Sequence, residues 1–454
     1  MTKKNRKRSA GIVLRDILLA LLLVAVVAAS AILVYRRFFE SGPATPDEKQ
    51  NIAKNHYDAD SFYEENGMLR YAKSAHLTGV DVSEHQEKID WAAVRAAGVD
   101  FAILRIGYRG YTEGSLREDS WFAENYTAAR AAGVQVGVYF FSQATTLEEA
   151  REETERMLNV YADFCENVLA MPVTRGQKTD KEKFNGAEAT YTIECMMHDR
   201  KALQAGTSHF FGDGFAKAFD IFYTDKNNQK VNPFQTSWGV STRLIGGIIM
   251  THGDNSGLVL PPKIAPVQIV IIPIAMHKEG VLEKARAVAE TLRAAGLRVK
   301  LDESEQSPGW KFAEYEMKGV PLRLELGPKD IEQNQCVLVR RDNGEKSFVS
   351  LDSLVESANT LMDAVHDGMY AKAKRNLDEN IYDAFTLEEA KRLQQEHGGF
   401  IRTMWCGDEA CEIRMKEEAG MTSRCIPFAQ QHLADTCAIC GKPAKKMIYW
   451  GVAY

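Results

Sequence analysis

This 454-residue sequence has no excess of positive charge, since 56 lysines and arginines stand against 62 aspartates and glutamates, for a formal net charge of -6. That balance excludes a protein that binds nucleic acid over its whole surface, so any such contact needs a local basic patch. The composition, 45% hydrophobic and 26% charged, is that of ordinary globular domains. The length allows about three of them.

Cysteine is absent before Cys165, and five of the eight cysteines follow residue 400. Such local clustering favours a metal site over a disulfide framework. Four of the five form the spacings C-x4-C and C-x2-C, which are typical of a closed tetrahedral zinc site: Cys406, Cys411, Cys437 and Cys440. The alternative is a set of unrelated core cysteines, and Cys425 is a spare fifth.

Residues 17–35 form a long apolar run that would span about 28 Å as a helix, close to the thickness of a bilayer core. Five basic residues between positions 3 and 8 predict a cytoplasmic N-terminus, although Arg36 and Arg37 weaken the asymmetry. The rival interpretation, a cleaved signal peptide, is disfavoured by the length of the run. We therefore predict a basic tail and membrane anchor over residues 1–40, and a polar linker over 41–76.

Residues 77–150 alternate strand-like and helix-like segments. Apolar runs at 77–83, 100–108 and 134–143 predict strands, and amphipathic stretches at 90–97 and 118–132 predict helices, which indicates a parallel sheet or barrel. The segments GVDVSEHQ, FAILRIGYRG and GVYFFSQA resemble glycoside hydrolase family 25, the lysozyme-like muramidases. That resemblance implies a partial β/α barrel, with Asp81 in the place of the family's first active-site aspartate.

Hydrolysis of a glycoside needs two carboxyl groups that flank the bond. The resemblance implies a D-x-E pair on a fourth strand, but no such strand follows residue 150. Instead, Thr146 with Glu149 predicts a helix start, and residues 147–168 give a helical apolar stripe through Met157, Tyr161 and Phe164. We interpret the acidic side chains of this helix as a solvated face: Glu148, Glu149, Glu152 and Glu153.

The stretch QTSWGVSTRLIGGIIMTHGDNSG, from residue 235, predicts a strand, a turn of small residues and a buried helix that begins with Arg243. A guanidinium in this place is suited to forked contact with phosphate. The stretch resembles motif 3 of class II aminoacyl-tRNA synthetases, and residues 152–454 resemble prolyl-tRNA synthetase of the archaeal and eukaryote-like type. The two resemblances meet inside one predicted helix, at about residues 146–155, which is typical of recombination, splicing or assembly error rather than of an ordinary domain boundary.

The synthetase resemblance implies a multidomain α/β and α+β protein. It implies the C-terminal part of an antiparallel catalytic domain over 151–264, an α/β anticodon-binding domain over 265–370 and a small zinc-binding domain over 371–454. It also implies a site for proline and ATP with Mg²⁺ at Gln204, Thr207, His209, Trp238, Ser241 and Arg243, where Arg243 would stabilise charge at the α-phosphate. RNA-facing residues would be Lys318, Arg323, Glu325 and Lys329.

Motifs 1 and 2 of the family, which supply the homodimer interface and a second arginine for ATP, have no counterpart in this sequence. We therefore expect a proline-tRNA ligase that binds proline tRNA but is impaired in activation. The alternatives are a membrane-anchored muramidase, also incomplete, and a non-catalytic tRNA-binding chimera. The synthetase part predicts a cytoplasmic location, whereas an N-terminus inside the cell would export everything that follows the anchor, and the sequence does not reconcile the two.

Overall fold

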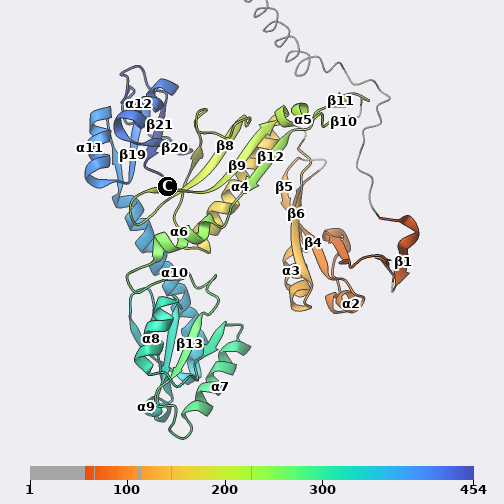
Figure 1. Ribbon diagram of the computed structural model, residues 1–454, viewed down its shortest axis with the longest axis vertical. Coiled ribbons are helices and arrows are strands. Elements are labelled where there is room, and N and C mark those ends of the chain that lie inside the picture. Colours follow the sequence, from red (N-terminus) through yellow and green to blue (C-terminus); the bar gives the residue numbers. More distant parts are fainter. Residues whose placement is uncertain (1–56, 66, 111–113, 145, 226) are drawn as a thin grey trace, which may run out of the picture. The chain divides into compact units, whose positions relative to one another are not determined.

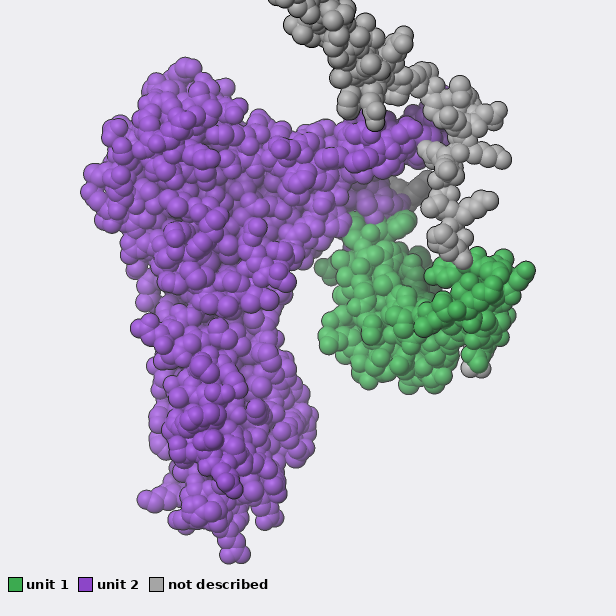
Figure 2. Space-filling view, in the orientation of Figure 1, with its two compact units in different colours: residues 1–108, 118–141 green, residues 109–117, 142–454 purple. Residues whose placement is uncertain are grey.

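A computed structural model describes residues 57–454 except 66, 111–113, 145 and 226. Contacts divide the chain into two units, residues 1–108 with 118–141, and residues 109–117 with 142–454 (Figure 2). Among the described residues, no helix combines the length and the apolar character needed to cross a membrane. The predicted anchor at residues 17–35 lies outside the described residues.

The first unit contains a parallel sheet. Strand β4 (Phe101–Arg109) pairs in parallel with both β3 (Gly79–Val82) and β6 (Gln135–Phe141), and helices α2 (Trp91–Ala96) and α3 (Phe122–Ala131) connect them (Figure 1). The small core includes Trp91, whose indole N–H donates to Asn125 Oδ1 at 3.0 Å. The alternation predicted from the sequence is therefore present, with the short β5 (Leu116–Glu118) added at the same sheet.

Part of the expected linker is folded. The short helix η1 (Ala59–Ser61) leads into β1 (Phe62–Glu65), which pairs antiparallel with β2 (Met68–Tyr71). The ring of Tyr71 lies against Tyr57 and Phe62, with centroid distances of 4.9 and 5.0 Å. Aromatic packing of this kind stabilises a hairpin that polarity alone did not predict.

Helix α4 (Leu147–Asn167) begins at the predicted capping box, because Thr146 and Glu149 cap each other reciprocally. Its buried face differs from the expected stripe, since Leu158, Ala162 and Cys165 are buried whereas Phe164 is exposed. The acidic face is not wholly solvated either. Glu153 is buried and accepts hydrogen bonds from Arg109 Nε at 2.8 Å and from Ser142 Oγ at 2.7 Å.

The second unit is built on an eight-stranded sheet in the order β12-β9-β8-β7-β20-β21-β19-β18. The first four strands come from residues 151–264, which the resemblance assigns to the catalytic domain, and the last four come from the C-terminal part, residues 371–454. Their bounds are β7 (Thr174–Gln177), β8 (Ala189–Met196), β9 (Ala202–Gly212), β12 (Gln235–Gly239), β18 (Ile381–Asp383), β19 (Phe400–Trp405), β20 (Thr422–Pro427) and β21 (Lys446–Gly451). The two parts expected as separate domains thus share one sheet, joined where Ile426 of β20 pairs with Gln177 of β7.

A buried ion network lies beside this junction. The carboxylate of Glu194 on β8 accepts from Lys178 Nζ at 2.7 Å and from Arg424 Nη2 at 2.9 Å, and Lys178 also donates to the carbonyl of Arg424 at 2.8 Å. Burial alone would raise the pKa of Glu194, but Lys178 and Arg424 outweigh it and hold that pKa below its ordinary value. The carboxylate is therefore charged at neutral pH.

Helix α6 (Arg243–His252) follows β12 and is only half buried, which differs from the expected buried helix. Leu244 and Ile248 pack into the core under α4, whereas Ile245 and Ile249 are exposed. Residues four apart share one face of a helix, so one apolar face of α6 is covered and the next is not.

The part expected to bind the anticodon, residues 265–370, is a five-stranded sheet in the order β14-β13-β15-β16-β17, in which β13 is parallel to β14 and β15 while β16 and β17 are antiparallel. The strands are β13 (Ile269–Pro273), β14 (Val299–Leu301), β15 (Leu322–Leu326), β16 (Gln335–Arg340) and β17 (Lys346–Ser350). Helices α7 (Val281–Ala294) and α10 (Leu354–Glu379) contribute to the core on one face. Helix α8 (Pro308–Met317) packs on the other through Tyr315 and Phe312.

The remaining helices are short or lie in the C-terminal part: α5 (Gly214–Ala218), α9 (Pro328–Glu332), α11 (Leu387–His397) and α12 (Glu409–Ala419). A small hairpin, β10 (Tyr223–Thr224) with β11 (Lys230–Val231), precedes β12. Within the described residues, the fold is therefore a mixed α/β multidomain architecture. The sequence predicted this general fold class.

Replacing Glu194 by glutamine should strongly destabilise the second unit, because Lys178 and Arg424 would remain buried without a compensating charge. Breaking a buried pair in this way costs about 3 to 5 kcal/mol in the free energy of unfolding. Urea denaturation followed by tryptophan fluorescence measures the loss. The matched control is Glu303→Gln, which removes an exposed partner of Arg286 and should change stability little. Equal effects of the two variants would contradict the assignment.

Candidate functional site

Three of the predicted proline and ATP residues share one face of the eight-stranded sheet. In register, Gln204 pairs with Glu194, Thr207 with Thr192 and His209 with Thr190. Directly paired residues project to the same side of a sheet, so these positions form one polar surface. The opposite face is the one that α4 covers, because Ser208 Oγ donates to the carbonyl of Thr154 at 2.7 Å.

The register does not bring Trp238 to that polar surface. Trp238 pairs with Ser208, whose side chain faces α4, so the indole lies on the covered side. Arg243, by contrast, lies beside Gln204, because its Nη1 donates to the Gln204 carbonyl at 3.1 Å. The Ser241 hydroxyl accepts from the backbone N–H of Arg243 at 3.3 Å, whereas Thr242, the N-cap residue of α6, makes no side-chain cap hydrogen bond.

His209 is held among aromatic rings. Its Nδ1 lies 3.0 Å from Thr190 Oγ1, and the rings of Phe184 and Phe211 lie 5.2 and 5.7 Å away, the latter stacked. Burial lowers the pKa of His209, so the imidazole is neutral at physiological pH. A neutral imidazole among aromatic rings can donate one hydrogen bond to a ligand, or accept one from it, without adding charge to the site.

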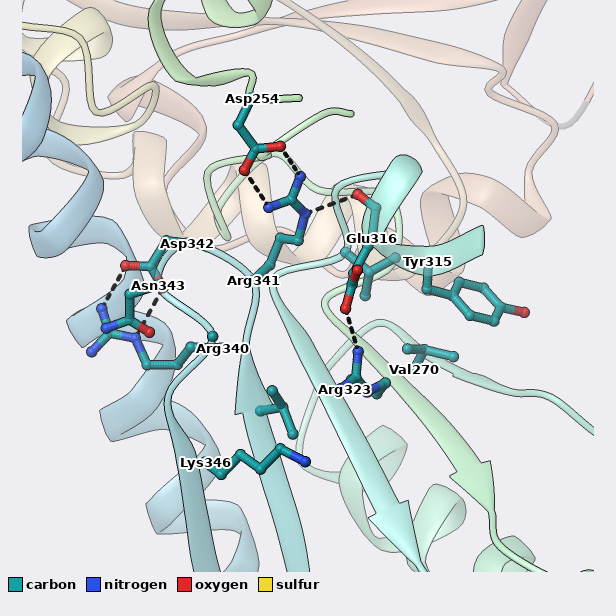
Figure 3. Close-up of a pocket in the computed structure, with 13 residues that line it drawn as sticks. Asp254, Val270, Tyr315, Glu316, Arg323, Arg340, Arg341, Asp342, Asn343 and Lys346 are labelled. Atoms are coloured by element: carbon teal, nitrogen blue, oxygen red, sulfur yellow. Dashed lines mark hydrogen bonds and ion pairs between the residues drawn. The ribbon is translucent and has the colours of Figure 1, made fainter. Parts of the chain in front are cut away.

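A second candidate site is a cavity of about 390 Å³ on the anticodon-binding part (Figure 3). Charged residues of both signs line it, and β15, β16 and the turn after β16 supply most of them. The basic ones are Arg323, Arg340, Arg341 and Lys346, and the acidic ones are Asp254, Glu316 and Asp342. Sequence reasoning singled out only Arg323 of these, since the others become neighbours only when the sheet is formed.

Carboxylates orient the arginines of this cavity. Arg323 donates to Glu316 Oε1 and Glu325 Oε1, both at 2.9 Å, and its guanidinium lies 3.9 Å from the centroid of the Phe312 ring. Arg340 forms a fork with Asp342 at 2.7 and 2.9 Å. Planar guanidinium groups fixed in this way present defined donors and stacking faces, which are suited to splayed nucleic-acid bases.

Arg341 joins the cavity to the segment after α6. Its two terminal nitrogens donate to the Asp254 carboxylate at 2.7 Å each, and its Nε donates to the Glu316 carbonyl at 2.8 Å (Figure 3). The hydrogen bonds from Arg341 lower the pKa of Asp254 to about 2. The anticodon-binding part is thereby tied to the helix that begins with Arg243.

The edge strand of this sheet, β17, supplies Lys346 to the lining of the cavity. Lys346 stands in one cross-strand row with Val339 and Arg323, and Phe348 stands in the next row with Val337 and Glu325. Phe348 is 70% exposed. Within the described part of the chain, no carboxylate pairs with Lys346, so an unpaired ammonium and an exposed ring border the site.

The other predicted RNA-facing residues lie around this site rather than in it. Glu325 reaches it through Arg323, Lys318 is the C-cap residue after α8 and pairs with Glu314 at 2.5 Å, and Lys329 lies exposed in α9. Their roles stay predictions. Sequence reasoning missed Lys346 and Phe348. They stand two residues apart on β17, and residues at that spacing point to the same face of a strand.

The four predicted cysteines come together in the C-terminal part. Cys406 follows β19, Cys411 lies in α12, and Cys437 and Cys440 lie in the turn before β21, with all four sulfurs within 4.8 Å of one another. Sγ–Sγ distances are 3.7 Å for Cys406 to Cys411 and 3.6 Å for Cys406 to Cys440. A tetrahedron of 2.3 Å zinc–sulfur bonds has edges of about 3.8 Å, so the set fits such an ion. Cys425 lies apart, buried in β20.

Asp81 is exposed on β3, where it pairs with Ile103 of β4. Burial and a hydrogen bond to Asp81 raise the pKa of the Tyr139 hydroxyl on β6. After β6 the chain enters α4 and then the antiparallel sheet, so among the described residues this parallel sheet gains no strand after β6. Asp119, the buried acid of this unit, is engaged by Arg105 Nε at 2.8 Å.

Comparison with known families gives three matches. Residues 268–360 match the family described as anticodon binding domain, and residues 387–454 match the C-terminal domain of prolyl-tRNA synthetase. Residues 80–202 match glycosyl hydrolases family 25. The third match runs beyond residue 150, where the resemblance was expected to end, and its last part covers antiparallel strands β7 and β8. Both resemblances seen in the sequence are confirmed.

The relatives are proline–tRNA ligases. The chain is 64% identical over 310 residues to the enzyme of Ruminiclostridium cellulolyticum, 62% over 309 to that of Clostridium novyi and 59% over 309 to that of Lachnospira eligens. Each alignment covers 68% of this chain and 64% of the relative. The chain therefore spans somewhat less than two thirds of the length of these ligases.

Changing Asp254 to asparagine should lower the melting temperature in a pH-dependent way. Because the pKa of Asp254 is about 2 in the folded chain against an ordinary 3.8, its pairing with Arg341 stabilises the fold fully above the ordinary value and is lost as pH falls through about 2. The difference in melting temperature between the two proteins should thus be smaller at about pH 3 than at about pH 5. A difference that vanishes near neutral pH would contradict this linkage.

Proposed function

We propose that the second unit binds proline tRNA through the cavity bounded by Arg323, Arg341 and Lys346. The observation that carries the proposal is the combination of oriented guanidinium groups, an exposed aromatic ring and an unpaired ammonium on one sheet face. Single-stranded RNA is recognised by such stacking and by hydrogen bonds to base edges. The match to the anticodon-binding family and the similarity to proline–tRNA ligases support proline tRNA as the RNA.

Phosphate contact would come mainly from Lys346. The three arginines already have carboxylate partners, so they contribute geometry and donors more than net charge. Lys346 adds a full positive charge at the open edge, close to where a phosphate backbone would pass. Lys318 and Lys329 would extend this contact along α8 and α9.

Activation of proline is the second part of the proposal. A carboxylate oxygen of proline would attack the α-phosphorus of ATP, form prolyl adenylate and release pyrophosphate, with Mg²⁺ accompanying the nucleotide. Arg243 would stabilise the developing negative charge, and Gln204, Thr207 and His209 would position the substrates. Trp238 lies on the opposite face of the sheet, which α4 covers, so it would support the site without lining it.

We expect this step to be slow in the chain by itself. A phosphoryl transition state needs several preorganised positive groups, and loss of one donor typically costs about a hundred- to a thousandfold in rate. Residues 80–202 match glycosyl hydrolases family 25, and the alignments with the ligases cover 68% of this chain. Proline-dependent exchange of pyrophosphate into ATP measures this step directly, and Arg243→Ala should abolish whatever exchange remains.

The four-cysteine cluster would hold a structural Zn²⁺, which supplies no chemistry to the reaction. The sulfur donors and their spacing suit zinc, and the ion would fix the turn of residues 437–440 against β19 and α12. That turn is already shaped by the Cys437 N–H, which donates to the Lys442 carbonyl at 2.8 Å. The metal would therefore lock a preformed loop.

A muramidase function has one favouring observation, the contact between Asp81 and Tyr139 in a matched family 25 segment. We expect no hydrolysis of peptidoglycan, because one carboxylate cannot both protonate the leaving oxygen and stabilise the oxocarbenium-like state. An anchor at residues 17–35 remains part of the proposal for the first unit. The alternative that we propose for the second unit is the cytoplasm, where ATP and tRNA are found, because an anchor with the N-terminus inside the cell would export that unit.

Lys346→Ala should weaken binding of proline tRNA and make it less sensitive to salt. Loss of one phosphate contact reduces the slope of log K against log salt by about 0.7 to 0.9. Gel shifts over a salt series measure both effects. Lys416→Ala removes an exposed lysine from α12, away from the cavity, and is the matched control. Identical slopes for both variants, or no shift at low salt, would contradict the proposed interface.

Metal analysis should find about one zinc per chain in protein purified without chelator. Cys437→Ser should lose the metal and lower the melting temperature, because three thiolates do not complete the tetrahedron. Cys425→Ala is the control, since this cysteine lies in a different core and should leave the zinc content unchanged. Full zinc retention by Cys437→Ser would show that the cluster does not hold the ion.

A further inference from the structure

Asp254 links the cavity on the anticodon-binding part to helix α6. Among the described residues that line the cavity, it alone comes from the segment after α6, and the others lie between residues 270 and 346. Asp254 follows closely on His252, the last residue of α6, and the first residue of that helix is Arg243. One short helix therefore separates a carboxylate of the cavity from the arginine proposed to stabilise charge at ATP.

Two contacts attach the segment after α6 to the cavity. The Arg341 guanidinium forks onto the Asp254 carboxylate, at 2.7 Å from each terminal nitrogen, and Arg341 Nε donates to the Glu316 carbonyl at 2.8 Å (Figure 3). Further along the segment, the Leu258 N–H donates to the Met317 carbonyl at 3.0 Å. Glu316 and Met317 are the last residues of α8, so both contacts meet the same end of that helix.

The second contact is close-packed. A Cβ atom at Gly257 would lie 2.6 Å from backbone atoms of Met317, and one at Gly319 would lie 2.7 Å from backbone atoms of Leu258. The φ angles of Gly257 and Gly319 are 130° and 70°, which side chains rarely allow. The chain after Asp254 is thus anchored to α8, so a displacement of Asp254 is passed to α6 and not along the chain.

The pair of Asp254 and Arg341 has two possible arrangements. A guanidinium has more N–H donors than the three that Arg341 uses, so a phosphate can also bind to it. The pKa of Asp254, about 2, keeps its carboxylate charged at neutral pH, and a phosphate at Arg341 would repel that charge. Asp254 Oδ1 also accepts from the Ser256 N–H at 2.9 Å, so a displaced carboxylate keeps a hydrogen-bond partner.

The two ends of α6 are held unequally. The buried His252 ends the helix, and its Nε2 lies 2.9 Å from a backbone carbonyl just after α4. One face of the helix, at Ile245 and Ile249, is exposed. A helix that is held at one end turns about that end, so the largest displacement falls on Arg243 at the other.

We propose that Asp254 is a positioning residue that couples the binding of RNA phosphate in the cavity to the placement of Arg243. A phosphate that binds Arg341 displaces the Asp254 carboxylate, and the released turn shifts α6. This inference rests on the proposed function, because it requires RNA to enter the cavity at Arg341. By linkage, a ligand that fixes Arg243 changes the affinity for RNA by the same factor.

The test uses the full chain purified in mild detergent and, as the probe, an RNA with the sequence of the anticodon stem-loop of proline tRNA. Binding of the probe is followed by fluorescence anisotropy. Hydrogen exchange of the α6 amides is then compared without the probe and at saturation. Although no described residue of α6 lines the cavity, we expect these amides to change their exchange rates by about fivefold or more when the probe binds.

Asp254→Asn should bind the probe about two- to fivefold more tightly, because a negative charge that competes for Arg341 is gone. In this variant, exchange of the α6 amides should no longer respond to the probe. A purely structural defect would weaken binding instead, so the two readouts separate a positioning role from loss of stability. Arg341→Lys keeps the charge but not the fork, and should likewise lose the α6 response.

Asp342→Asn is the matched control. Asp342 lines the same cavity and forks onto Arg340 at 2.7 and 2.9 Å, but Arg340 continues to the Ala364 carbonyl of α10 and not to the segment after α6. This variant should also bind the probe more tightly, yet keep the α6 response.

The coupling is overturned if α6 exchange stays unchanged when the probe saturates the unmodified chain. It is also overturned if Asp254→Asn keeps the α6 response, or if Asp342→Asn loses it to the same extent. Failure of the probe to bind at low salt would overturn the proposed RNA interface, and the coupling with it. Binding without an α6 response would overturn the coupling alone.

Discussion

The pairing of Lys178, Glu194 and Arg424 is the interaction on which the second unit depends. Each residue comes from or next to a different strand of the junction, namely β7, β8 and β20, and all three are buried. A buried carboxylate is tolerable only when its charge is matched and its lone pairs are satisfied. Here two cations and the Thr192 hydroxyl at 2.8 Å do so, which fixes the C-terminal strands onto the catalytic ones.

A second buried set reinforces the same junction. Glu412 of α12 accepts from Thr179 Oγ1 at 2.8 Å and from Ser423 Oγ at 2.9 Å, and burial raises its pKa. Hydroxyl groups rather than cations satisfy this carboxylate. Cys411 of the cysteine cluster is the residue before Glu412, so the candidate metal site and the sheet junction share one turn of α12.

Local structure followed from the sequence wherever a short-range pattern determined it. The capping box at Thr146 and Glu149, the βα alternation before residue 143 and the cysteine spacings each reflect residues within a few positions of one another. What failed depended on partners distant in sequence. Glu153 is buried because Arg109 reaches it, and α6 is half exposed because nothing in the described chain covers Ile245. The face of Trp238 is fixed by register, which a strand pattern without its neighbour does not define.

Helix α10 sets the distance between two cores of the second unit. Its 26 residues extend over about 39 Å, and its buried side chains pass from the core of the anticodon-binding part, at Leu354 and Met362, to the core under β19, at Leu377. One continuous helix couples rotation to translation, so a single inserted residue would turn everything beyond it by about 100°. The length of α10 therefore sets the separation between the cavity and the cysteine cluster. Residues inserted into α10 would increase that separation, and they would keep the orientation of the two parts only if they completed whole helical turns.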